Sequence, residues 1–106
     1  MKLKERTANN VHTAFVEEAK ANQRLLTFAK KADEEGLSQI AHLFRAVAAA
    51  EAVHSRRHFA MLEAVADTQT NLERAFQSEN AVNGVYYPKM LQEAERKTAS
   101  YGIARV

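Results

Sequence analysis

The sequence predicts an all-α protein built as an antiparallel bundle of long helices. Three observations carry this prediction. Only three of the 106 residues are glycine and one is proline, the two residue types that disfavour helices most strongly. The rest is rich in alanine and in long unbranched side chains, which favour helices over strands. Apolar residues recur at spacings of three and four along three segments, which is the period of an amphipathic helix.

The first predicted helix runs from about Thr7 to Gly36. A threonine hydroxyl can cap the free N–H groups at a helix start, and glycine is common just past a helix end. One face of this segment carries a stripe of residues that we expect to face the core. The stripe consists of Val11, Phe15, Glu18, Asn22, Leu25, Ala29 and Ala32.

The second predicted helix begins at Leu37 or Ser38 and continues to about Ala66. Its stripe has the same spacing and therefore also predicts one face turned towards the core. This stripe consists of Ile40, Phe44, Val47, Glu51, His54, His58, Met61 and Val65.

A third helix is expected after Asp67, which together with Thr68 and Thr70 predicts a turn and a helix cap. Pro88 lies inside this helix. Because proline has no backbone N–H and its ring clashes with the preceding turn, we expect a local kink or bulge there. The stripe of this helix consists of Leu72, Phe76, Glu79, Val82 or Asn83, Tyr86 and Met90.

The connections between these helices are short, so consecutive helices should be antiparallel neighbours in one domain over residues 1–106. The segment from Asn10 to Glu18 recurs as the segment from Asn71 to Glu79, both with the pattern Asn, apolar, two variable residues, Ala-Phe, two variable residues, Glu. The chain is therefore interpreted as two helix hairpins, the second incomplete. Because three helices leave one side of a bundle open, we expect the fourth to be truncated or supplied by a partner chain.

Composition and charge exclude several classes of function. The formal charge is only +2 and no basic block is present, so nucleic acid is not expected as a partner. The absence of cysteine excludes disulfides, zinc–thiolate sites, iron–sulfur ligation and thiol catalysis. No apolar run approaches the roughly 20 residues that span a bilayer, and no apolar stretch follows the basic start as in a secretory signal. We therefore expect a cytoplasmic protein with no membrane partner.

Three carboxylates provide the functional signal, because Glu18, Glu51 and Glu79 each fall on the stripe of a different helix. Burying an unpaired carboxylate is costly, and the three should lie at similar heights in an antiparallel bundle, so we expect cations between them. His54 follows Glu51 by three residues, which places both side chains on one helix face. Di-iron and di-manganese bundles use a Glu from each of two helices and Glu-x-x-His from the other two. The predicted metal ligands are Glu18, Glu51, His54 and Glu79.

Three further residues are expected beside these ligands. His58 continues the second stripe one turn past His54, as a packed or hydrogen-bonding histidine. Of Tyr86 and Tyr87, we expect one to pack in the core and the other to hydrogen-bond a ligand carboxylate. No catalytic side chain is predicted beyond the metal ligands. The alternative is a metal-free core in which the acids pair with arginine or histidine.

At these residues the sequence resembles the rubrerythrins, a family of ferritin-like proteins. The resemblance extends over almost the whole chain, from about Thr7 to Ala104. It is carried by Ala14-Phe-Val-Glu-Glu18, Phe28 to Gly36, Ile40 to Phe44, Ala50-Glu-Ala-Val-His54 with the following His58, Asp67-Thr68, Asn71-Leu72, and Glu79 through Tyr86-Tyr-Pro88.

This resemblance implies a ferritin-like four-helix bundle with a two-iron centre bound by Glu18, Glu51, His54 and Glu79. It implies an oxidoreductase for peroxide reduction or oxygen-linked iron oxidation, in defence against oxidative stress. A set of Glu and His ligands suits iron or manganese better than zinc or copper. The resemblance also implies a homodimer or larger homo-oligomer, formed in some members by exchange of helix hairpins between chains.

Several positions depart from the family pattern. Val82 stands where the family has a glutamate three residues after Glu79, and Leu25 stands where it has a tyrosine. The given sequence contains neither the second Glu-x-x-His nor a cysteine-rich rubredoxin module, so electrons would have to come from a separate donor protein. These departures favour an alternative function, a metal-free helical association module whose metal site has decayed.

Overall fold

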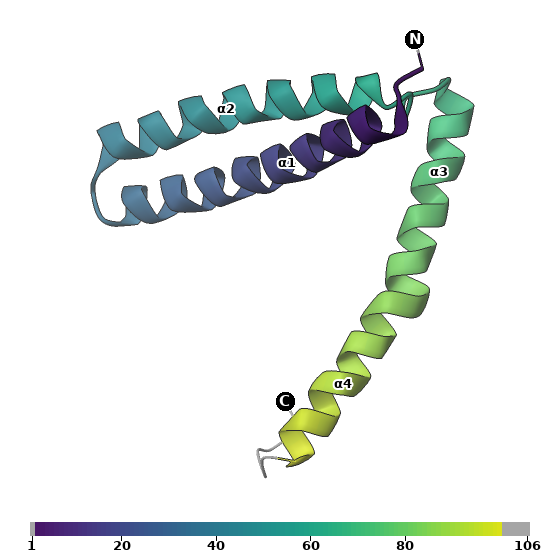
Figure 1. Ribbon diagram of the computed structural model, residues 1–106. Coiled ribbons are helices and arrows are strands. Elements are labelled where there is room, and N and C mark those ends of the chain that lie inside the picture. Colours follow the sequence, from purple (N-terminus) through teal and green to yellow (C-terminus); the bar gives the residue numbers. More distant parts are fainter. Residues whose placement is uncertain (1, 101–106) are drawn as a thin grey trace. The chain divides into compact units, whose positions relative to one another are not determined.

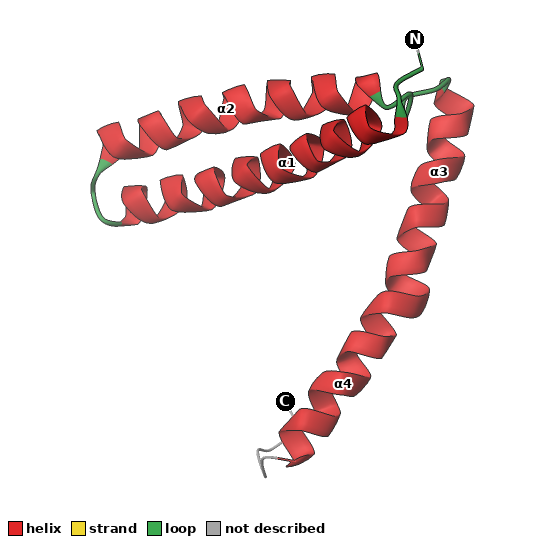
Figure 2. Cartoon of the chain, in the orientation of Figure 1, coloured by secondary structure: helices red, strands yellow, loops and turns green. Residues whose placement is uncertain are grey.

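The computed structural model describes residues 2–100, and every regular element in that range is helical (Figure 2). The all-α prediction is confirmed. The chain divides into two units that meet between Val65 and Ala66, and each is described by itself below. Over the described residues, no helix combines the length and the apolar character needed to cross a membrane. The elements are α1 (Glu5–Glu34), α2 (Ser38–Met61), α3 (Thr68–Ala81), the π-helical segment η1 (Val82–Tyr86) and α4 (Tyr87–Ser100).

In the first unit, α1 and α2 lie side by side and antiparallel, as predicted (Figure 1). The turn between them depends on Gly36, whose φ of 76° lies in the left-handed region that glycine adopts without a steric penalty. The N–H of Leu37 donates to the carbonyl of Ala32 at 2.8 Å, and the N–H of Gly36 donates to that of Asp33 at 3.0 Å. This pair of bonds satisfies carbonyls that a helix end would otherwise leave unpaired.

The predicted outer ends of these two helices need correction. Helix α1 begins at Glu5, so Thr7 lies within its first turn and does not cap it. Helix α2 ends at Met61 and not near Ala66, because Glu63 adopts a left-handed conformation with φ of 56° that an α-helix cannot continue through. Val65 consequently lies beyond the helix and is exposed.

The contact between α1 and α2 is built on small side chains. The predicted stripe of α1 is confirmed, since all seven of its members are buried or half-buried. On α2 the buried residues are Ala41, Ala48 and Ser55, which recur at the heptad spacing of coiled-coil-like contacts. The buried face of α2 therefore lies about one residue further around the helix than the stripe predicted for it. Its members Ile40, Val47 and Met61 are exposed, because alanine allows closer approach of the two backbones than these larger side chains would.

Side chains of the hairpin also tie its two helices together along their length. The rings of Phe15 and Phe59 lie 4.7 Å apart between centroids, and those of Phe28 and Phe44 lie 5.8 Å apart. Near the turn, Arg45 on α2 forms an ion pair with Asp33 on α1. These contacts fix which residues of α1 face which residues of α2, and this register determines the geometry of the site described below.

The second unit begins with a pair of hydrogen bonds between the Asn71 side chain and the backbone of Ala66. The Asn71 amide accepts a hydrogen bond from the N–H of Ala66 and donates one to the carbonyl of the same residue, both at 2.8 Å. Helix α3 then starts after Asp67, as predicted. The bulge predicted at Pro88 is confirmed, because the π-helical segment η1 ends two residues before this proline. Proline cannot donate to the carbonyl four residues earlier, and a wider π turn accommodates the missing bond.

Candidate metal centre

The α1–α2 hairpin brings three of the four predicted ligands together. Glu18 projects from α1, and Glu51 and His54 project from α2. One potential ligand atom from each of the three lies within 4.8 Å of the other two. The Glu18 and Glu51 side chains are 17% and 24% exposed, whereas the His54 side chain is 52% exposed. The site is therefore partly covered on the carboxylate side and open at the imidazole.

Contacts on both sides of Glu18 hold α1 against α2 at this level. The Phe15–Phe59 ring contact lies one turn towards the start of α1. One turn in the other direction, the side-chain amide of Asn22 donates to the carbonyl of Ala48 at 2.7 Å. A carboxylate between two such contacts has little freedom to move away from α2. Asn22 was expected on the core stripe of α1, but this bond was not predicted, although a polar residue on an apolar stripe is a signal for one.

Glu51 and His54 form the second part of the site. Their separation of three residues places them on one face of α2, and His54 Nδ1 lies 3.6 Å from Glu51 Oε1. That distance is too long for a hydrogen bond. It is short enough for both atoms to bind the same cation, because nitrogen and oxygen ligands commonly lie about 2.1 Å from such a metal.

The atom that best indicates a missing partner is Oε2 of Glu18. It is buried and, in the part of the chain that the structure describes, has no hydrogen-bond partner. Burial of a carboxylate oxygen without a partner is costly, and a divalent cation held with Glu51 and His54 would remove that cost. A set of two carboxylates and one imidazole matches the ligand preference of iron and manganese. The residues present therefore fit the predicted type of metal.

Glu79, the fourth predicted ligand, lies in the last turn of α3 in the second unit. Its side chain is exposed, and the amide nitrogen of Asn83 lies 3.5 Å from its Oε2 and 3.0 Å from its backbone oxygen. The π-helical segment begins three residues later, and π turns inside α-helices are frequent at functional sites. Val82, which stands where the resembling family has a glutamate, opens this segment.

The remaining residues predicted near the ligands fall in different places. Tyr86 closes the π-helical segment and Tyr87 opens α4, and both are exposed. Their role beside the ligands stays a prediction. His58 lies on α2, and its Nδ1 is 2.7 Å from Oε1 of Glu18. His58 is thus the residue, of itself, Tyr86 and Tyr87, that contacts a predicted ligand in the described part of the chain.

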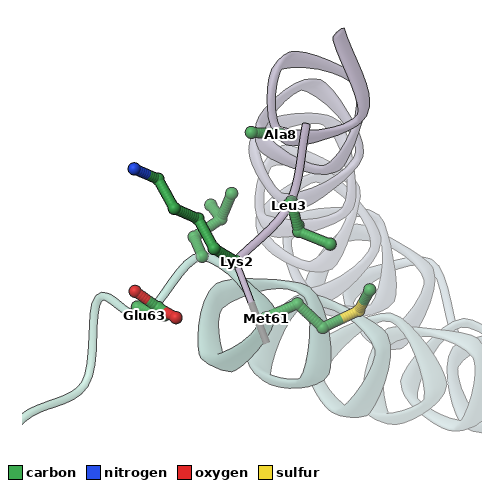
Figure 3. Close-up of a pocket in the computed structure, with 6 residues that line it drawn as sticks. Lys2, Leu3, Ala8, Met61 and Glu63 are labelled. Atoms are coloured by element: carbon green, nitrogen blue, oxygen red, sulfur yellow. The ribbon is translucent and has the colours of Figure 1, made fainter. Parts of the chain in front are cut away.

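A pocket at the open end of the hairpin is separate from this group. Figure 3 shows Leu3 and Met61 on one side of it and the charged side chains of Lys2 and Glu63 on the other. Its volume is about 210 Å³. None of the three clustered ligands lines it, so the metal-binding chemistry and this pocket occupy different parts of the hairpin.

Comparison with known proteins identifies the family. The rubrerythrin family model matches residues 9–101 of the chain. The chain belongs to the rubrerythrin family. Membership supports a di-iron protein and an all-α ferritin-like bundle, in agreement with the carboxylate and histidine group of the hairpin.

Two rubrerythrins and a nigerythrin are similar to the chain. Rubrerythrin-1 of Clostridium acetobutylicum is 32% identical over 107 residues, covering 85% of this chain and 55% of the relative. The rubrerythrin of Porphyromonas gingivalis is 30% identical over 105 residues, covering 87% and 52%. Nigerythrin of Nitratidesulfovibrio vulgaris is 41% identical over 56 residues, covering 53% and 28%. The chain thus spans about half the length of the two rubrerythrins.

Proposed function

We propose that this rubrerythrin-family chain is a cytoplasmic non-haem di-iron oxidoreductase that reduces peroxide or couples oxygen to iron oxidation in defence against oxidative stress. The observation that carries the proposal is the Oε2 of Glu18, which is buried without a hydrogen-bond partner among the described residues, on a side chain that clusters with Glu51 and His54. Without a cation this arrangement costs stability. With one, it becomes half of the ligand set of a carboxylate-bridged bundle.

The proposed ligands have different tasks. Glu18, Glu51 and Glu79 would supply carboxylate oxygens to the metals, and His54 would supply an imidazole nitrogen. The bound metals, two iron ions or their manganese counterparts, would supply the electrons that a peroxide or oxygen substrate takes up. The half-covered position of Glu18 and Glu51 limits water around the carboxylates, and the exposed imidazole of His54 leaves an approach from solvent.

A second copy of the chain is the partner that its exposed surfaces favour. Large apolar side chains are exposed on both units, which is expected of surfaces that pack against another chain. We propose a homodimer or larger homo-oligomer with helices exchanged between copies. The apolar side chains exposed for such contacts include Ile40, Leu43, Val47, Leu72 and Phe76.

One specific observation favours the second candidate, a metal-free helical association module. Val82 offers no ligand atom at the position of the family's glutamate. In this alternative Glu18 and Glu51 would be remnants of a lost centre. The two candidates differ in whether metal binding stabilises the fold.

The deciding experiment measures metal per chain by elemental analysis across a size-exclusion peak of known mass. We expect about two iron or manganese ions per completed four-helix bundle, and loss of that metal in Glu51→Ala without loss of helical content. The matched control is Glu17→Ala, because Glu17 neighbours Glu18 but its side chain is 60% exposed and forms an ion pair with the equally exposed Lys20. Protein that contains no metal, and takes up none when iron(II) or manganese(II) is added without oxygen, would select the association module.

Peroxide turnover provides the second part of this test. Metal-loaded protein should reduce hydrogen peroxide with a small-molecule electron donor, and Glu51→Ala should not. If metal is bound but peroxide is not consumed, oxygen uptake during iron(II) oxidation distinguishes the two redox activities named above. Binding without either activity would exclude the oxidoreductase and leave a metal-binding protein.

A further inference from the structure

The contact between His58 and Glu18 points to a role for a histidine outside the predicted ligand set. His58 Nδ1 lies 2.7 Å from Glu18 Oε1, and the two side chains are 33% and 17% exposed. Nδ1 of His58 is buried, as is Oε2 of Glu18, and neither atom has a hydrogen bond of good geometry among the described residues. Nδ1 of His58 and Oε1 of Glu18 therefore lie within hydrogen-bonding distance, but their geometry is not that of a hydrogen bond.

His58 approaches Glu18 without joining the cluster of ligand atoms. The group whose atoms converge within 4.8 Å contains Glu18, Glu51 and His54, and His58 is not a member over the described residues. It lies one turn beyond His54 on α2. The carboxylate of Glu18 thus has one oxygen beside His58 and a second oxygen without a partner.

We propose that His58 is a positioning residue for the metal centre, whose Nδ1–H holds Oε1 of Glu18 so that Oε2 is presented to the metal. The proposal rests on the proposed function, because it requires Glu18 to be a ligand. Carboxylates that bind metals are commonly held by hydrogen bonds from neighbouring groups. Hydrogen bonds of this kind are often poorly aligned in ligand-free structures and tighten on binding, which accounts for the short contact without a good angle.

The test compares two substitutions of His58. Asparagine can place an N–H donor close to the position of Nδ1, whereas leucine has a similar volume and no donor. The measurement is the dissociation constant for manganese(II) and for cobalt(II), by competition with a chromophoric chelator. We expect His58→Leu to weaken binding 10- to 100-fold, the usual cost of removing such a supporting group, and His58→Asn to stay within about threefold of the unsubstituted protein. The control is His42→Leu, since His42 lies exposed on the same helix.

The outcomes separate this proposal from the proposed function. If the unsubstituted protein binds metal and both His58 variants bind equally well, His58 has no positioning role and the metal centre stands. If both variants lose binding to the same extent, the imidazole itself is required and the positioning role is wrong. Circular dichroism of each variant establishes that the helices have formed before binding is compared.

A measurement without metal covers the case in which the leucine variant does not fold or the protein binds no metal. Long-range proton–nitrogen correlation spectra of the unsubstituted protein report which ring nitrogen carries hydrogen. We expect Nδ1 of His58 to be protonated, and its nitrogen shift to change in Glu18→Ala but not in Glu17→Ala. A ring protonated only at Nε2 would overturn the proposal, whereas failure of metal binding alone would overturn the proposed function.

Discussion

Asn22 on α1 donates a hydrogen bond from its side-chain amide to the backbone carbonyl of Ala48 on α2, at 2.7 Å. This bond lies one turn from Glu18 along α1 and one turn from Glu51 along α2. A polar residue in a helix contact can specify how two helices align, at some cost in stability. The bond therefore links the register of the hairpin to the distance between two proposed ligands.

We expect Asn22→Leu to lower metal affinity more than it lowers stability. The lost hydrogen bond contributes on the order of 1 kcal/mol, and the leucine side chain recovers part of this by burying apolar surface. Register is then less well specified, so Glu18 and Glu51 meet less often in the binding arrangement. Urea unfolding of the metal-free protein and metal titration measure the two effects. Thr13→Ala is the control, because the exposed Thr13 hydroxyl donates to the carbonyl of Asn9 on its own helix.

Ala48 itself provides a steric test of the small-residue contact. It is 1% exposed, so Ala48→Leu should push α1 and α2 apart and destabilise the hairpin by about 1–3 kcal/mol, the usual range for overpacking. Ala49→Leu is a matched control on the exposed side of the same helix. Thermal unfolding followed by circular dichroism measures both. Equal stability of the two variants would show that the helices do not approach as closely as the buried alanines indicate.

Glu18→Gln should separate function from stability. The substitution keeps the shape of the side chain but removes its charge, so metal loading should fall strongly. Because Oε2 is buried without a partner, the metal-free variant should be more stable than the unsubstituted protein, by about 1 kcal/mol. Lower metal loading together with higher stability is expected where a site is retained for function at a cost in stability. A less stable metal-free variant would mean that the charge of Glu18 serves the fold.

The start of α3 should respond to acid through Asp67. A side-chain hydrogen bond with Thr70 lowers the pKa of the Asp67 carboxyl below its ordinary value of 3.8. A lowered folded-state pKa stabilises the folded state above the unfolded value, and the contribution is lost as the pH falls from about 3.8 through the folded pKa. Thr70→Val should raise this pKa towards 3.8, as measured by carbon-13 NMR of the Asp67 carboxyl. An unchanged pKa would exclude the hydroxyl as the cause.

Much of the helical structure could be predicted from the sequence because its signals are local. Gly36 ends α1 through its own backbone preference, and Pro88 perturbs its helix through its own missing N–H. The face of α2 that packs against α1 could not be predicted in the same way. Hydrophobicity favours Ile40 and Val47 over alanine, whereas the two backbones approach most closely where side chains are small.

Those parts of the site that follow from helical periodicity could also be predicted from the sequence. The spacing of Glu51 and His54, and the position of Glu18 on a core stripe, are periodic features that a sequence displays directly. The contact of His58 with Glu18 depends on the rotation of one helix against another, which sequence spacing does not specify. Glu79 lies in the second unit and stays a prediction.

The contact between Asn83 and Glu79 bears on the charge that Glu79 offers to a cation. The polar neighbour of this carboxylate is an amide, which gains or loses no proton in the physiological range. The contact therefore leaves the net charge at this position unchanged, and the exposed carboxylate of Glu79 keeps its full attraction for a cation.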